Sequence, residues 1–133
     1  MFGSLDISTS GLVAQRAQLD TIAGNVANSQ TTRRLDGVPG PFLRRVALLA
    51  AGSDSGGPGV RVTGVVEDRR TLPRPVKDPG HPDADENGIV YYPNVDPATE
   101  MINAMVAARA YEANVTAMEA TKSIIAGSLR ILA

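Results

Sequence analysis

All nine prolines of this 133-residue chain lie between Pro39 and Pro97, so residues 1–38 and 98–133 contain none. Proline fixes φ and has no backbone N–H, and it is therefore excluded from helix interiors. Nine of the 13 glycines also fall in the middle of the chain, between residues 35 and 96. This distribution predicts helical ends that flank a middle rich in turns.

The composition limits the class of protein further. Apolar residues make up 43% of the chain, which argues against complete disorder, but 18 of them are alanine and only five residues are aromatic. A large self-contained core is therefore difficult to build. The absence of cysteine excludes disulfides and thiolate metal sites. A net charge of −1 without a strongly basic segment argues against a nucleic-acid partner. No apolar run approaches the roughly 20 residues of a membrane span, and we expect no cleavable secretory signal at the start of the sequence.

The last 36 residues carry the strongest helical pattern. Asp96 and Pro97 are typical of a helix start, an N-cap followed by proline at the first helical position, and Glu100 lies in the first turn, where the helix dipole favours a negative charge. Beyond them an apolar heptad seam continues for more than four heptads in steps of three and four residues. Its members are Met101, Ala104, Ala108, Tyr111, Val115, Met118, Lys122, Ile125, Leu129 and Leu132.

A helix over residues 97–132 would be about 54 Å long at 1.5 Å per residue. Such a helix could belong to a monomeric bundle, but its length favours a helix that packs against other chains. Lys122 is the one charged member of the seam. It could extend along the surface, pair with a carboxylate of a neighbour, or set the register of packing.

The N-terminal segment predicts a shorter helix over residues 8–28, with Asp6 or Ser8 as its cap. It could lie antiparallel along part of the C-terminal helix. Its apolar residues recur every seven positions, with Ile22 and Ala23 on the intermediate face, at Leu5, Leu12, Leu19 and Val26.

The middle of the chain predicts a small β element. Residues 60–67 alternate with period two, which predicts a strand, and residues 88–92 predict another. Residues 42–51 fit a strand or a short helix, and residues 53–59 predict a flexible turn. We therefore expect a β-hairpin or a three-stranded element with long loops. The overall prediction is a mainly α chain with a central β insertion.

Candidate chemical sites are weak. Residues Asp83–Gly88 imitate a calcium loop, D-x-D-x-N-G, but Asn94 stands at the twelfth position, where a bidentate glutamate is required. His81 is the only histidine, so a histidine-based metal cluster or proton relay is excluded. No catalytic constellation is present, and we predict a protein that is not an enzyme and has no cofactor. A calcium-binding module and a monomeric helical adaptor remain as alternative functions.

The amino-acid sequences of both ends resemble those of a known family. Residues 10–32 resemble the N-terminal signature of bacterial flagellar axial proteins, and residues 78–101 and 108–123 resemble the flagellar basal-body rod proteins, in particular those of the proximal rod. Two features depart from the wider pattern: Gly24 replaces a usual asparagine, and residues 35–45 replace the Gly-Tyr of many hook and distal-rod relatives. The motif residues carried by this chain are Ala14, Gln18, Leu19, Asp20, Ile22, Ala23, Asn25, Ala27, Asn28, Thr31, Tyr111, Glu112 and Asn114.

The resemblance implies a fold and a function. Residues 1–35 and 96–133 would form an antiparallel, coiled-coil-like inner domain that assembles around a channel, and residues 36–95 would form an outer region. The chain would be a structural subunit of the proximal rod, exported uncleaved by the flagellar type III apparatus and located in the rod that crosses the periplasm. Its partners would be further copies of itself, proximal and distal rod proteins and the protein at the MS-ring/rod junction.

The apolar pattern and the resemblance together predict an assembly interface. Each chain presents apolar surface that it cannot cover alone, and assembly would bury it. Isolated helices are marginal in water, so we also expect the terminal helices to be partly disordered before assembly. The predicted interface residues are Leu12, Leu19, Ile22, Val26, Met101, Tyr111, Val115, Met118, Ile125 and Leu129.

Overall fold

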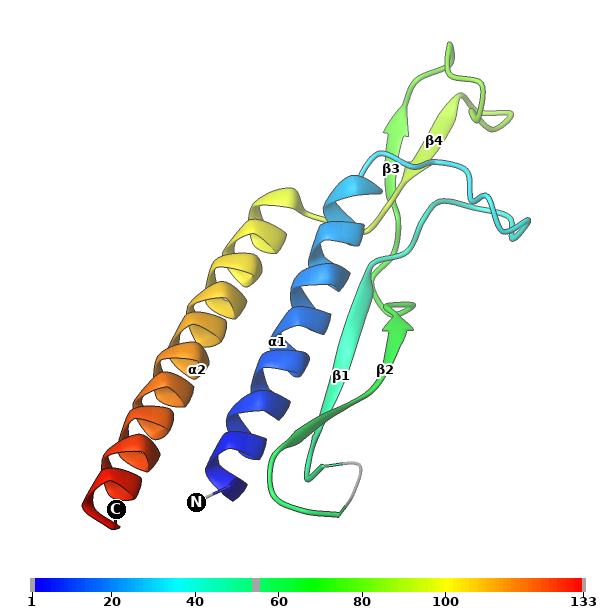
Figure 1. The fold of residues 1–133 in the computed structure, drawn as a ribbon. Helices are drawn as coiled ribbons and strands as arrows, with labels where there is room; N and C mark the ends of the chain where they lie inside the picture. The colour runs from blue at the N-terminus through cyan, green and yellow to red at the C-terminus, as the bar shows by residue number, and fades with distance from the viewer. Residues whose placement is uncertain (1, 54–55, 133) are drawn as a thin grey trace. The chain divides into compact units, whose positions relative to one another are not determined.

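A computed structural model describes residues 2–53 and 56–132 and shows two long helices separated by short strands (Figure 1). The predicted mainly α chain with a small β element is confirmed. The helices are α1 (Phe2–Ala27) and α2 (Pro97–Leu132), and the strands are β1 (Arg45–Ala51), β2 (Val60–Glu67), β3 (Arg74–Lys77) and β4 (Ile89–Tyr92).

The chain divides into two compact units, and each contains a part of both helices. Unit 1 consists of Met1–Asp20, Ala47–Gly64 and Ala104–Ala133, and unit 2 consists of Thr21–Val46 and Val65–Asn103. The functional division predicted from the sequence, with an inner domain of residues 1–35 and 96–133 and an outer region of residues 36–95, stays a prediction.

The start of α2 confirms the predicted cap. The carboxylate of Asp96 accepts hydrogen bonds from the backbone N–H of Ala98 and the hydroxyl of Thr99, and its carbonyl accepts one from the N–H of Glu100 at 3.0 Å. These bonds satisfy donors that the first turn of a helix leaves free. The predicted bounds of this helix, residues 97–132, agree with α2.

The predicted start of the first helix is wrong. The structure places it at Phe2, six residues before residue 8, so Asp6 and Ser8 lie inside α1 instead of capping it. The physical reason is that residues 2–7 contain no proline and that Leu5, which is half-buried, continues the seven-residue apolar repeat. The helix ends at Ala27, and Asn28 then donates from its side chain to the carbonyl of Gly24 at 2.8 Å.

Within unit 1, the N-terminal part of α1 lies antiparallel beside the C-terminal part of α2 (Figure 1). The contact uses small residues, because Ala14 and Ala107 are buried and a Cβ added at Gly11 would lie 2.7 Å from Nδ2 of Asn114. The β1–β2 hairpin joins α1 through Ser10, whose hydroxyl accepts a hydrogen bond from the N–H of Val60 at 3.1 Å. Small side chains therefore bring the two helices close together.

Within unit 2, β3 and β4 form an antiparallel pair in which Arg74 faces Tyr92 and Val76 faces Val90. The sequence predicts β4 but misses β3, because Pro75 in its middle argues against a strand. Proline is tolerated at the edge of a sheet, where its missing N–H costs no ladder hydrogen bond, and β3 is such an edge. Val90 is fully buried and forms the centre of this unit with Val95.

The β1–β2 hairpin confirms the strand predicted at residues 60–67 and resolves residues 42–51 as a strand that begins at Arg45. The described sheets are two separate pairs, β1–β2 and β3–β4, so a three-stranded element is wrong. Residues 54 and 55 of the predicted turn lie outside the described residues. Around them, Gly52 donates its N–H to the carbonyl of Gly59 at 2.8 Å and closes the hairpin.

Candidate functional site

A buried polar network lies in unit 2 at the first turn of α2. Glu100 is only 1% exposed and Asn25, near the end of α1, is 0% exposed. The carboxylate of Glu100 accepts hydrogen bonds from Nδ2 of Asn25 at 2.9 Å and from Nε of Arg44 at 2.7 Å. Asn25 also binds the backbone of Arg45, accepting from its N–H and donating to its carbonyl, both at 2.8 Å. We call Asn25, Arg44 and Glu100 the polar network.

Asn94 extends the polar network to the end of the β1–β2 hairpin. Its Oδ1 accepts from the backbone N–H of Arg44 at 2.7 Å, and its Nδ2 donates to the carbonyls of Asp68 and Thr71, each at 2.9 Å. Among the described residues, every buried side-chain nitrogen and oxygen has a hydrogen-bond partner. Four chain segments that are distant in sequence, around residues 25, 44–45, 68–71 and 94–100, therefore meet in one satisfied cluster.

This network is structural in character, and the sequence did not predict it. Asn25 is a motif residue and Glu100 a first-turn acid, but nothing in the local sequence pairs either with Arg44. A signal existed in Asn25 itself, because asparagine is a poor helix former and needs a partner when it lies within a helix on an apolar face.

The inward face of α2 overlaps the predicted seam only in part. It includes Glu100, Ala107 and Asn114, which are not seam members, beside the half-buried seam residues Ala104 and Ala108. Of the predicted interface residues on α2, Val115, Met118 and Ile125 are half-buried, whereas Met101, Tyr111 and Leu129 are exposed. Lys122 is exposed, and Thr121 beside it is half-buried.

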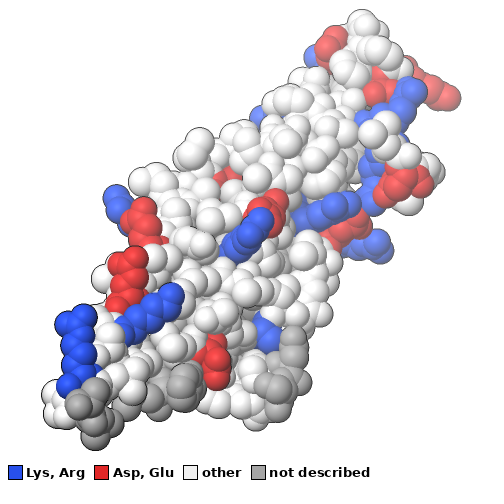
Figure 2. Space-filling model, viewed as in Figure 1, with Lys and Arg blue, Asp and Glu red and all other residues white. Residues whose placement is uncertain are grey.

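Four apolar side chains near the start of α2 are exposed to solvent. Met101 is 59% exposed, Ile102 and Met105 are each 62% exposed and Val106 is 65% exposed. We call these four residues the α2 patch; none but Met101 was in the predicted interface. Figure 2 shows few charged side chains over the beginning of α2 and charges of both signs toward its end.

The predicted interface residues of α1 are mostly covered within the chain. Leu12, Leu19 and Ile22 are half-buried, and Val26 is exposed. Ile7 and Val13 are exposed apolar residues that the prediction did not include. The free chain therefore offers less apolar surface on α1 than on α2.

The remaining motif residues lie mainly at the surface. Asp20 forms an exposed i,i+4 pair with Arg16, and Glu112 forms an exposed pair with Arg109 at 2.8 Å. Gln18 is half-buried on α1. Asn28 is the first residue after α1, and its Oδ1 accepts a hydrogen bond from the hydroxyl of Thr31.

Gly24 and Gly11 differ in the space around them, which predicts opposite responses to alanine. A Cβ at Gly24 meets nothing within 4 Å, whereas a Cβ at Gly11 lies 2.7 Å from Asn114. We expect Gly24→Ala to stabilise the chain by about 0.5–1 kcal/mol, because glycine weakens a helix interior. Gly11→Ala should gain less or lose stability. Urea unfolding followed by circular dichroism measures both, and an equal gain in the two variants would contradict the close approach.

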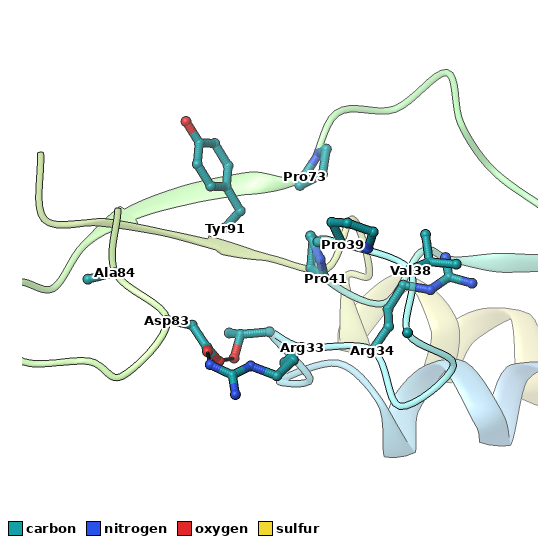
Figure 3. A pocket seen from close by; sticks show the side chains of 12 residues that line it. Arg33, Arg34, Val38, Pro39, Pro41, Pro73, Asp83, Ala84 and Tyr91 are labelled. Atoms are coloured by element: carbon teal, nitrogen blue, oxygen red, sulfur yellow. Dashed lines mark hydrogen bonds and ion pairs between the residues drawn. The ribbon is translucent and has the colours of Figure 1, made fainter. Parts of the chain in front are cut away.

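A shallow pocket of about 500 Å³ in unit 2 contains the start of the calcium-like loop (Figure 3). Asp83 is bound there by the hydroxyl of Thr32 and the guanidinium of Arg33, which lower the pKa of its carboxyl. Asp85 accepts from the N–H groups of Asn87 and Ile89 and stabilises a turn. Among residues 2–53 and 56–132, no three histidine or acidic side chains gather as a metal site would need.

The loop after α1 contains a second group of ion pairs, and these change the pKa of a carboxyl. The guanidinium of Arg34 binds Asp36 and Glu67, and it lowers the pKa of the Asp36 carboxyl to about 2, with help from the N–H of Val38. A carboxyl with a lowered pKa stabilises the fold above its unfolded value of about 3.9, and this contribution is lost as the pH falls toward 2.

We expect Arg34→Gln to return the pKa of Asp36 toward its usual range, as measured by NMR titration of the side-chain carboxyl carbon. Asp96 is the control, because Thr99 and backbone N–H groups lower the pKa of its carboxyl without Arg34. A pKa of Asp36 that stays low in the variant would show that Arg34 is not the cause.

Comparison with known proteins decides the family. Residues 5–33 match the family model described as Flagella basal body rod protein, and residues 86–131 match Flagellar basal body rod FlgEFG protein C-terminal. The flagellar basal-body rod protein FlgC of Bacillus subtilis (strain 168) is 39% identical over 98% of this chain and 97% of the relative. The chain belongs to the FlgC family. FlgC of Borreliella burgdorferi is 36% identical over 99% of this chain and 97% of the relative. FlgC of Salmonella typhimurium is 36% identical over 95% of this chain and 93% of the relative.

Membership of the FlgC family confirms the resemblance drawn from the motif residues. The chain is a structural subunit of the flagellar basal-body rod, and neither a calcium module nor a monomeric adaptor finds support among the relatives. In the described part of this FlgC-family chain, no helix has the length and apolarity that crossing a bilayer requires.

Proposed function

We propose that this rod protein enters the rod by burying the α2 patch, together with the predicted interface residues, against other rod subunits. The observation that carries the proposal is the exposure of Met101, Ile102, Met105 and Val106, each at 59–65%, beside a core of small residues. Contiguous apolar surface on a free chain is typical of an interaction site.

The energy available from this surface is adequate for association. Full burial of one such side chain contributes about 1.5–3 kcal/mol, so four exposed side chains supply a driving force of several kcal/mol before the costs of association. Contacts that do not close on themselves extend along an axis, which suits a rod. The antiparallel helices would form a coiled-coil-like inner domain in the assembled rod. Before assembly, the terminal helices would be only partly ordered.

The partners and location follow from the family. Further copies of the chain, other proximal and distal rod proteins and the protein at the MS-ring/rod junction would cover the α2 patch. The chain would reach the rod in the periplasm through the flagellar type III export apparatus without cleavage. It has no catalytic role in this proposal.

Basal bodies isolated from the bacterium that encodes the chain test the proposal. We expect mass spectrometry to find the uncleaved chain in them and cryo-electron microscopy to place α2 against neighbouring subunits. Cells that lack the gene should form no rod and should be non-motile. Normal rods without the chain, or an α2 patch that faces solvent in the assembled rod, would contradict the proposal.

A further inference from the structure

We infer that Asn25, Arg44 and Glu100 are positioning residues that fix the rotation of α2 about its own axis, so that its apolar side stays free for partners. The inference rests on the proposed function for the use of that side. The rotation itself is a property of the single chain, and it can be measured without assembly.

The rotation of α2 decides whether Met101 is free for a partner. The face that α2 turns inward carries the buried Glu100 and Ala107, and Ala108 and Val115 are half-buried beside them. One residue corresponds to about 100° around a helix. A turn of that size in one direction would bring Met101 inside the chain and would carry Glu100 and Ala107 toward solvent.

The polar network opposes such a turn. The carboxylate of Glu100 is 1% exposed and receives one hydrogen bond from Asn25 and one from Arg44. Turning α2 by one residue would remove this carboxylate from both donors. Breaking a buried charged pair leaves groups without partners, which is strongly unfavourable, and a buried polar side chain can thereby specify one helix arrangement.

A second contact in unit 1 shows the same choice of face. Asn114 lies against Gly11, where a Cβ would be 2.7 Å from its Nδ2. Asn114 lies 14 residues after Glu100, and Gly11 lies 14 residues before Asn25, which is two heptads on each helix. Ala107, midway between Glu100 and Asn114, is buried. Small and polar side chains thus recur on the face that α2 turns inward.

Single cysteines measure the rotation, because the chain has no cysteine of its own. The purified full chain would carry Met101→Cys, Ala110→Cys or Ala107→Cys, and the rate of maleimide labelling would be compared for each. Met101 is exposed, Ala110 is half-buried and Ala107 is buried, so the rates should fall in that order. Ala107 lies on the same face as Glu100, so a turn that brings Met101 inward carries both Ala107 and Ala110 toward solvent, whereas unfolding speeds labelling at all three positions.

Removing the polar network with Asn25→Leu and Glu100→Leu should lower the first rate and raise the other two. We expect the Met101→Cys thiol to label slower, and the Ala110→Cys and Ala107→Cys thiols to label faster, each by about threefold or more. Val90→Ala, which removes buried apolar volume from unit 2 without touching a polar contact, is the control and should preserve the order of the three rates.

Unchanged rates would overturn the inference. A joint rise at all three positions would also overturn it, because the network would then only keep the chain folded, and so would opposite changes produced by Val90→Ala. The labelling assay uses the free chain, so its result does not depend on rod assembly. The proposed function is tested separately, and it would be contradicted if charged residues on the α2 patch left rod assembly intact.

Discussion

Arg44→Met is expected to lower the free energy of unfolding by about 3–5 kcal/mol, because it leaves the buried carboxylate of Glu100 without its charged partner. The Arg44 side chain is 27% exposed, but Glu100 is only 1% exposed and Asn25 alone cannot neutralise it. Urea unfolding of the full chain, followed by circular dichroism at low protein concentration, measures the change.

Arg33→Met is the matched control for this prediction. Arg33 also binds a carboxylate, that of Asp83, but its side chain is 74% exposed. Exposed ion pairs contribute about 0–1 kcal/mol, so the control should lose little stability. Equal losses in the two variants would show that burial of Glu100 does not govern the stability of unit 2.

The sequence predicted the parts of this fold that depend on local chemistry. Asp96 and Pro97 specify the start of α2 through a cap and a fixed φ, and the period-two alternation over residues 60–67 specifies β2. Both signals act within a few residues, so a single sequence contains them in full. The motif at the two ends of the chain was sufficient to indicate the family, because its residues are specific in both type and spacing.

The features that the sequence did not predict depend on contacts between distant segments. β3 forms despite Pro75 because it pairs with β4 as an edge strand. α1 begins at Phe2 because Leu5 is still half-buried within the chain. The rotation of α2 is the clearest case, since the predicted seam places Met101 and Tyr111 on the packed face and both are exposed. Glu100 is buried in their place through its pairing with Asn25 and Arg44, 75 and 56 residues away.

Met105→Asp is expected to abolish rod assembly and motility while leaving the free chain folded. Met105 is exposed in the free chain, so a carboxylate there stays hydrated and costs about 0.5 kcal/mol or less. In an assembled rod the same carboxylate would be buried against an apolar partner without compensation, which is strongly unfavourable. Swimming in soft agar, the yield of basal bodies and circular dichroism of the purified variant measure the three quantities.

Ser123→Asp is the matched control on the same side of α2. Ser123 is exposed and lies 18 residues after Met105, which is five full turns of the helix. Its neighbourhood carries the exposed, charged residues Glu119 and Lys122, so an added carboxylate meets polar surroundings. We expect this control to assemble and swim. Motile Met105→Asp cells would show that the α2 patch stays exposed in the rod, and loss of helix in purified Met105→Asp would show that Met105 supports the free chain instead of its assembly.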